Sequence, residues 1–254
     1  MVDHGSTDGT SQCIKDEFPD VILLNGDSDL WWTGATNLGL KWVLGIANVN
    51  DMVLTLNNDL VVDNNYLESL MALYHKFPIS LIGSVSVDIH DNEKIVFAGI
   101  RWNSITAKYK PRVNLNQPYG IFKLKNEYII SDLLPGRGTL IPVTAFKEVG
   151  VYDEALFPHY AADEDFSLRC KQAGYNILVA TQACVKCYVN ETGINYDTKV
   201  SFRSIIISLT SIKSKSNITK RWYWAKKHSK LPIIYMGFTI YRIFFSYIKS
   251  LILK

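Results

Sequence analysis

The chain has 254 residues, of which 48% are hydrophobic and 20% are charged, so it can bury a substantial core and is not expected to be disordered. The net charge of +3 hides an asymmetry, because residues 199–254 hold twelve of the 27 Lys and Arg residues and none of the 24 Asp and Glu residues. Residues 1–198 therefore carry a net charge of −9. We expect an acidic domain over 1–198 and a basic helical tail over 199–254. The acidic body and the lack of a recognition motif argue against nucleic acid as a partner.

The first half of the chain alternates between apolar runs and helical patterns. Apolar runs at 21–25, 52–56 and 79–87 predict strands, and the segments 36–48 and 66–77 carry the spacing of amphipathic helices. Strands that are apolar throughout suit a parallel sheet covered on both faces. The alternation of strands and helices therefore favours a doubly wound, Rossmann-like arrangement.

The second half predicts a mixed arrangement. Between 88 and 132 the periodicity is lost, and VFAGIRWN and YGIFKLKNEYII suggest antiparallel strand pairs. A strand is expected within 133–142, followed by a short helix that Gly150 closes. A further helix runs from Asp163 to about Ala173, and the next strand begins with ILVA.

Four cysteines and no recognisable secretory signal predict a reduced, cytoplasmic-facing protein. Cys184 and Cys187 form CVKC inside the apolar run LVATQACVKCYV. They are interpreted either as core thiols of a buried strand or as half of a metal or redox site.

The tail ends in a long apolar stretch, 231–253, with Arg242 near its middle and Lys249 near its end. Together with the preceding RWYWAKKHSK, this pattern favours a helix lying on an anionic membrane surface through 221–254. An inserted helix and a helix packed on its own domain or on a partner are the alternatives.

Three segments carry candidate chemistry. Asn57, Asn58 and Asp59 follow an apolar strand, where a carboxylate flanked by amides suits a divalent cation that also binds a diphosphate. The same residues are also ordinary strand terminators. At the start of the chain, DHGSTDGT is either a simple helix-capping turn or a loop whose Asp3 accepts a hydrogen bond from a nucleobase or ribose. Gly34 and Asn37 stand near a predicted helix start, where backbone donors meet phosphate oxygens.

The segment FPHYAADEDFSLRCKQAGY crowds three acids at a helix start. Asp163 suits an N-cap, Glu164 suits the positive end of the helix dipole, and Asp165 is placed to pair with Arg169. A carboxylate in this position can accept a proton from a hydroxyl nucleophile. His159 is either a further ligand contact or an ordinary loop histidine.

In this order, DHGSTDGT, GATNLGL, LTLNNDLVVDNNYL and PGRGTLIPVTAFKEVGVYDEALFPHYAADEDFSLRCKQAGY resemble a family 2 glycosyltransferase, from residue 1 to about residue 190. The resemblance implies a GT-A fold, which is an α/β fold with a Rossmann-like mixed sheet and helices on both faces. It also implies inverting transfer of a sugar from a nucleotide-sugar donor, with Mn²⁺ or Mg²⁺ as cofactor. The expected setting is synthesis of cell-surface polysaccharide or lipopolysaccharide by a peripheral enzyme on the inner face of the membrane. The expected acceptor is a glycan or a lipid-linked sugar.

By position, the resemblance makes Asp163 the catalytic base and gives Asp165 a structural role. It makes Asp59 the metal ligand. The nucleotide-sugar contacts implied on the donor side are Asp3, Gly34, Asn37, Asn57 and Asn58. The acceptor side is implied to hold Gly136, Arg137 and His159.

Two features depart from the family pattern. The triplet at 57–59 has a single carboxylate, and the strand, helix and partial second strand that precede DHGSTDGT in the family are absent from this sequence. A catalytic domain incomplete at its N-terminus is therefore expected. A non-catalytic remnant that binds carbohydrate or a partner is the main alternative. A related nucleotidyltransferase is a third hypothesis, which lacks a glycine-rich, lysine-bearing motif to support it.

Overall fold

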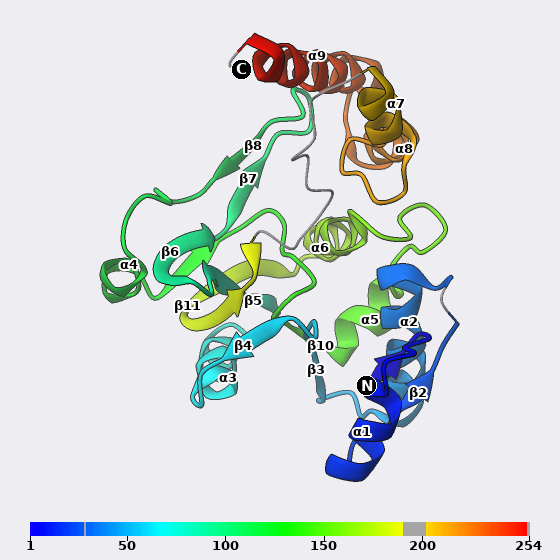
Figure 1. Cartoon of the computed structure of the whole chain (residues 1–254). Coiled ribbons are helices and arrows are strands. Elements are labelled where there is room, and N and C mark those ends of the chain that lie inside the picture. Colours follow the sequence, from blue (N-terminus) through cyan, green and yellow to red (C-terminus); the bar gives the residue numbers. More distant parts are fainter. Residues whose placement is uncertain (28, 190–201, 253–254) are drawn as a thin grey trace.

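The computed structural model describes residues 1–27, 29–189 and 202–252 (Figure 1). Its first elements are β1 (Val2–Asp3), α1 (Thr10–Glu17), β2 (Leu24–Asn25) and α2 (Trp31–Ile46). β1 and β2 pair in parallel as a small sheet of their own. The strand predicted at 21–25 is therefore reduced to its last two residues. α2 begins five residues earlier than predicted, where the Thr33 hydroxyl donates to the carbonyl of Phe157 at 2.6 Å and anchors the first turn.

The central sheet runs in the order β3 (Met52–Thr55), β10 (Thr139–Pro142), β5 (Ser80–Asp88), β11 (Asn176–Cys187) and β4 (Leu60–Val62). β6 (Asp91–Phe97) pairs with β5, and β9 (Tyr128–Ile130) pairs with β11. β5 and β11 are parallel, whereas β10 is antiparallel to both β3 and β5. β3 and β5 thus point the same way, as the alternating pattern predicts. They are not neighbours, however, because a strand from much later in the chain lies between them.

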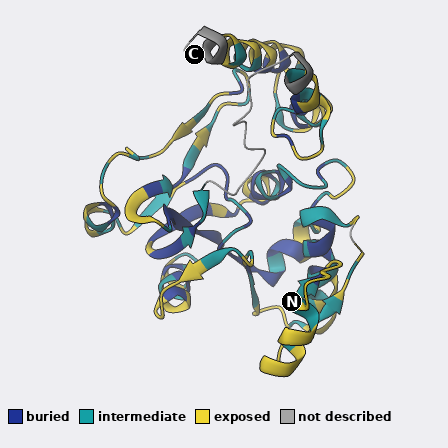
Figure 2. Cartoon of the chain, viewed as in Figure 1, coloured by how far each residue is buried: buried dark blue, intermediate teal, exposed yellow. Residues whose placement is uncertain are grey.

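Helices cover both faces of this sheet, as expected. α3 (Tyr66–Lys76) lies on one face, and α2, α5 (Val143–Val149) and α6 (Ala162–Gln172) lie on the other. β5 is buried along its whole length, and its alternate side chains enter different cores, with Leu81 and Val85 on the α6 side and Ile82 on the α3 side. Figure 2 shows the resulting buried centre of the molecule. Burial on both faces explains why this strand is apolar throughout.

The segment between β6 and β10 differs from its prediction. β7 (Ile100–Trp102), which lies in VFAGIRWN, forms an antiparallel hairpin with β8 (Tyr109–Pro111), in a segment where no strand was expected. YGIFKLKNEYII, however, begins as the helix α4 (Tyr119–Lys125) and only ends as strand β9. The reason is that Pro118 precedes the first turn and that Tyr119 and Phe122, one helical turn apart, are both buried.

The tail contains α7 (Phe202–Thr210), α8 (Ile218–His228) and α9 (Pro232–Ile252). Trp224 and Tyr235 belong to the same apolar cluster as β5 and α6, and a guanidinium N–H of Arg242 donates to the Ala107 carbonyl at 2.6 Å. α8 and the beginning of α9 therefore pack on the rest of the chain, which was one of the alternatives for this segment. The predicted junction at 198/199 lies outside the described residues. Within the described ranges no helix is long and apolar enough to cross a membrane.

The CVKC segment lies in β11, as the interpretation as a buried strand predicts. Cys184 and Cys187 are both buried and free, and burial raises the pKa of the Cys184 thiol to about 11. The Cys187 thiol donates to the carbonyl of Val87 at 3.3 Å. Both side chains therefore serve as protonated members of the sheet's core.

Candidate active site

A cavity of about 900 Å³ lies where the start of α6 meets the loops around β3 and β10 and the tail helix α8. Six of the residues predicted from the sequence line it: Asn57, Asp59, Gly136, Arg137, His159 and Asp163. The other four, Asp3, Gly34, Asn37 and Asn58, are not part of its lining. Segments separated by more than a hundred residues in the sequence therefore converge on one cavity.

Asp163 lies in the first turn of α6. The helix begins at Ala162, after Ala161 has adopted a left-handed conformation (φ 73°), so Asp163 is its second residue and not the N-cap that we predicted. One carboxylate oxygen of Asp163 accepts the backbone N–H of Gly136 at 2.8 Å, and the other accepts that of Glu164 at 3.0 Å. A side chain at Gly136 would collide with the ring of Trp32. Glycine is therefore required for this backbone to reach the carboxylate.

Asp163 and Glu164 form an acidic pair on the cavity wall. Burial raises the pKa of Asp163, although the N–H groups of Gly136 and Glu164 and the charge of Arg137 oppose that shift. Burial and the negative charge of Asp163 raise the pKa of Glu164 to about 7. Because backbone donors favour the ionised form of Asp163, that residue loses its proton first, and Glu164 holds a proton up to about neutral pH. The pair thus presents one carboxylate that is a stronger base than an exposed aspartate.

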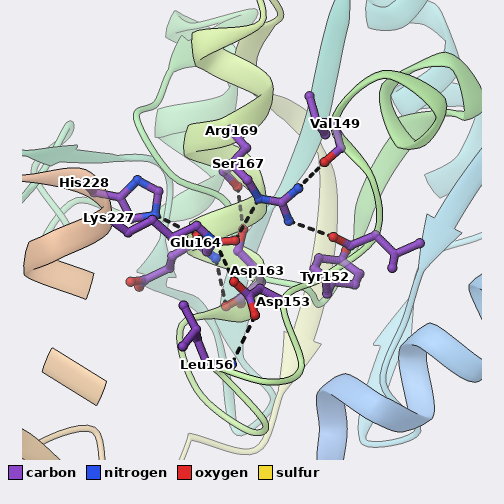
Figure 3. A network of polar contacts seen from close by, with 12 residues as sticks. Val149, Tyr152, Asp153, Leu156, Asp163, Glu164, Ser167, Arg169, Lys227 and His228 are labelled. Carbon is purple, nitrogen blue, oxygen red and sulfur yellow. Dashed lines mark hydrogen bonds and ion pairs between the residues drawn. The ribbon is translucent and has the colours of Figure 1, made fainter. Parts of the chain in front are cut away.

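Asp165 has the structural role that the sequence suggests for it. Its side chain is completely buried and accepts hydrogen bonds from Arg169 Nε at 2.8 Å, His228 Nε2 at 2.7 Å and Lys227 Nζ at 2.8 Å. Arg169 also donates to the carbonyls of Val149 and Val151. Figure 3 shows this network at the start of α6, with Arg169 on one side and His228 and Lys227 on the other. These contacts fix α6 and thereby the position of Asp163 in the cavity.

The Asn57–Asp59 triplet lies between the end of β3 and the start of β4, and its side chains differ in exposure. Asn57 and Asp59 line the cavity, whereas Asn58 is exposed to solvent. The side-chain oxygen of Asn57 already accepts the indole N–H of Trp32 at 3.1 Å. The Oδ1 atom of Asp59 is buried and has no hydrogen-bond partner among the described residues. A buried carboxylate oxygen without a donor is the group in this triplet that fits a divalent cation.

Arg137 and His159 bring further unsatisfied groups to the same cavity. Arg137 Nε and His159 Nδ1 are buried, and neither has a partner in the part of the chain that the structure describes. Burial lowers the pKa of His159, and the charges of Lys220 and Lys213 lower it further, so this imidazole is neutral near pH 7. Polar atoms of this kind are normally hydrogen-bonded, which indicates that a polar ligand completes the site.

The predicted residues outside the cavity are held by other contacts. The N–H of Gly34 donates to the Leu30 carbonyl within α2, and Asn37 donates to the carbonyl of Tyr152 and to Glu154 Oε2. Neither presents a free donor to a phosphate in this structure. Asp3 accepts hydrogen bonds from the Ser11 hydroxyl and the Ser6 backbone, which lower its pKa to about 2. A carboxylate can accept further bonds, so the nucleobase contact at Asp3 stays a prediction.

The sequence reasoning missed the contribution of the tail. Ser214, Lys215, Lys220, Arg221 and Trp224 all line the cavity. The sequence favours a membrane surface for residues 221–254, with packing on the domain as an alternative, and assigns no role to residues 214–220. The signal for an inward face was present, because Arg221, Trp224, Ala225 and His228 recur at the three- and four-residue spacing of one helix face.

Comparisons with known proteins agree with this arrangement. The model of the family described as "Glycosyl transferase family group 2" matches residues 52–253. The N-acetylglucosaminyl-diphospho-decaprenol L-rhamnosyltransferases of two Mycobacterium tuberculosis strains are 25% identical over 190 residues, which cover 69% of this chain. The chain spans 61% of the length of these curated relatives.

Solved structures show the same fold. The crystal structure of GalNAc-T7 with UDP, GalNAc and Mn²⁺ matches 93% of this chain and 48% of its own, with a TM-score of 0.54 and 15% identity. At 15% identity this match supports a shared fold and nothing further. The fold is GT-A, as the resemblance in the sequence implies. With a family model that covers most of its length and a cavity built around the expected acidic helix, the chain belongs to glycosyl transferase family group 2.

Proposed function

We propose that this chain catalyses the inverting transfer of a sugar from a nucleotide-sugar donor to a hydroxyl group of a lipid-linked acceptor, in the synthesis of cell-surface polysaccharide. The observation that carries the proposal is the position of Asp163. Its carboxylate is held by two backbone N–H groups on the wall of a large cavity, and its pKa is raised by burial. These are the properties of a general base for a hydroxyl group.

The proposed reaction is a single displacement. Asp163 accepts the proton of the acceptor hydroxyl as its oxygen forms a bond to the anomeric carbon. The bond between that carbon and the diphosphate oxygen breaks on the opposite face, and the nucleoside diphosphate leaves with the electron pair. Because no enzyme nucleophile takes part, the configuration at the anomeric carbon is inverted.

A divalent cation fits the donor side of the cavity. Among the described residues no cluster of three or more Asp, Glu, His or Cys side chains is arranged to hold a metal. The unpartnered Oδ1 of Asp59 is the group best placed for Mn²⁺ or Mg²⁺, with diphosphate oxygens as the remaining ligands. When bound, such an ion would neutralise charge on the departing diphosphate. Arg137 lies in the same lining and supplies a fixed positive charge.

The acceptor assignment has two supports. The curated relatives are named as transferases that act on a sugar linked through diphosphate to decaprenol. In this chain, α9 also exposes large apolar side chains that suit a lipid surface, including Ile233, Tyr241 and Phe245. We propose a peripheral location on the inner face of the membrane. Residues 1–198 would form the catalytic domain, and the tail would close the cavity and meet the lipid.

Two measurements test this function. Calorimetric titration with UDP, GDP and dTDP in turn, each with Mn²⁺, should show binding of at least one of them. No binding at millimolar concentration would favour the non-catalytic alternative. Asp163→Asn should lower transfer by a factor on the order of 10² to 10⁴ while nucleotide affinity stays within about twofold. Retained transfer in this variant would contradict the assignment of Asp163 as the base.

A further inference from the structure

The loop between α7 and α8 and the first turn of α8 bring three basic residues to the cavity. Asn217, the N-cap of α8, accepts the Lys220 N–H at 3.0 Å and donates to the carbonyls of Thr210 and Ser211. Arg221 Nε donates to the Lys215 carbonyl at 2.9 Å. These local bonds fix the turn that brings Lys215, Lys220 and Arg221 to the cavity wall.

These three cations differ from Lys227, a basic residue near the end of α8. Lys227 is paired with Asp153 at 2.6 Å and with Asp165 at 2.8 Å. In the described part of the chain, Lys215, Lys220 and Arg221 make no ion pair with a carboxylate. Among the described residues Lys220 Nζ donates only to the Ile212 carbonyl, at 3.0 Å, and burial lowers the pKa of this ammonium group. A half-buried cation without an anion is costly, and a bound anion would remove that cost.

The charges of the cavity lining, together with a divalent ion, can balance more than one bound anion. The described lining holds the cations Arg137, Lys215, Lys220 and Arg221 against the carboxylates of Asp59, Asp163 and Glu164, of which Glu164 is only partly ionised near neutral pH. A diphosphate diester carries two negative charges. The divalent ion proposed at Asp59 would balance the two charges of the nucleotide sugar's diphosphate. The tail cations then remain available for a second diphosphate.

The surroundings of these cations suit a substrate that is anionic at one end and apolar at the other. Val96, Phe97 and Ile100 line the cavity together with Trp224, whose buried indole N–H has no partner among the described residues. The ring of Trp224 lies 5.7 Å from that of Trp102, which in turn contacts Tyr235 of α9. The cavity wall is thus continuous with the helix whose outer face is apolar and exposed.

We propose that Lys215, Lys220 and Arg221 form a binding subsite for the diphosphate group of the lipid-linked acceptor. This inference rests on the proposed function, because it assigns one of the two diphosphates of that reaction to the tail. It gives residues 214–221 a role in the acceptor specificity of the enzyme, separate from the donor site at Asp59. A monophosphate-linked lipid would lose half of the charge that these cations bind.

Equilibrium binding of farnesyl diphosphate tests the subsite. Farnesyl monophosphate and inorganic pyrophosphate are titrated as comparison ligands, and each is monitored by the fluorescence of the cavity tryptophans. The variants are Lys220→Met and Arg221→Gln. Lys226→Met serves as the matched control, because Lys226 is exposed on the outer side of the same helix, over the ring of Trp222. Affinity for a nucleoside diphosphate with Mn²⁺ is measured on every variant.

The wild type should bind farnesyl diphosphate more tightly than the monophosphate and than pyrophosphate. Each cavity variant should weaken farnesyl diphosphate binding roughly tenfold or more, and Lys226→Met should leave it unchanged. Nucleotide affinity should change less than about twofold in all of them. Loss of nucleotide binding with retained prenyl diphosphate binding would assign the cations to the donor and overturn the proposal. Equal affinities of wild type and cavity variants for farnesyl diphosphate would do the same.

The two proposals fail in different ways. A wild-type protein that binds farnesyl diphosphate through these cations but no nucleoside diphosphate would contradict the proposed transfer and leave the subsite intact. Nucleotide binding without prenyl diphosphate binding would contradict the subsite alone. Arg221→Lys, which keeps the charge, should recover part of the lost affinity, and this recovery distinguishes a lost contact from a misfolded variant.

Discussion

The imidazole of His228 lies 2.7 Å from the carboxylate of Asp165, and both side chains are almost completely buried. This hydrogen bond joins α6, which carries the proposed base, to α8, which supplies one wall of the cavity. The acidic helix α6 and the tail are therefore held together by a buried polar contact as well as by the packing of Trp224.

The link between Asp165 and His228 should be visible in stability. His228→Ala removes one partner of a buried carboxylate and should lower the free energy of unfolding by about 3 kcal/mol. Denaturant unfolding measures this change, and His75→Ala, an exposed histidine on α3, is the control. A loss no larger than that of the control would contradict the structural role of the contact.

The same carboxylate predicts a dependence of stability on pH. Burial by itself would raise the pKa of Asp165, but hydrogen bonds from His228 and Lys227 and the charge of Arg169 hold it below its ordinary value. A lowered pKa stabilises the fold above the pKa of an unfolded aspartate, about 4, and this contribution is lost as the pH falls through the folded pKa. The wild type should thus lose more stability than Asp165→Asn when the pH is lowered below about 4.

Glu164 should influence the pH profile of transfer. Glu164 keeps its proton up to about pH 7, so its ionisation adds a negative charge beside Asp163 near neutral pH. Glu164→Gln removes this second ionisation and should abolish the change in kcat/KM near pH 7, while the acid limb set by Asp163 stays in place. Steady-state rates between pH 5 and pH 9 give both features of the profile. Glu148→Gln, a carboxylate on α5 that bonds Tyr175 outside the cavity, should leave both unchanged. A Glu164→Gln profile identical to that of the wild type would show that the two acids are not coupled.

Asp59 should control metal affinity. Asp59→Asn is expected to weaken Mn²⁺ binding in the presence of a nucleoside diphosphate by a factor on the order of 10 to 100, because it removes the unpartnered carboxylate. Electron paramagnetic resonance of free Mn²⁺ provides the titration. Asp63→Asn is the matched control, because Asp63 lies just after β4, as Asp59 lies just before it, and is already paired with Lys186. Equal affinities of the two variants would rule out the assignment of Asp59.

The outer face of α9 should bind lipid. Ile233, Phe238, Tyr241, Phe244, Phe245 and Ile248 are exposed at the spacing of one helix face. The double substitution Phe244→Glu with Phe245→Glu should reduce sedimentation with vesicles of phosphatidylglycerol at least tenfold. Ile46→Glu changes an equally exposed isoleucine at the end of α2 and should have no effect. Unchanged sedimentation of the α9 variant would contradict the membrane proposal.

Much of the fold could be predicted from local pattern. The helix at 66–77, the strand at 79–87 and the acidic helix that ends before Gly174 lie within one or two residues of their predicted bounds. Their signals are local, because apolar spacing, a capping glycine and an unbroken apolar run depend on neighbouring residues alone. The strand predicted over YGIFKLKNEYII was wrong for the same reason. Its alternating residues fit a strand locally, but the burial of Tyr119 and Phe122 favours the helix α4.

The sequence by itself determined the α/β class, the family and the identity of the acidic helix, because these depend on residue types in a fixed order. Only the tertiary structure decided that β10 lies between β3 and β5, that Asn37 donates to Tyr152 and Glu154, and that Lys220 and Arg221 face the cavity. The physical reason is that strand neighbours and cavity walls are set by contacts between distant segments. A basic helix has the same sequence whether its charges face lipid or a diphosphate site, and here the burial of Trp224 and the bond between His228 and Asp165 turn it inward.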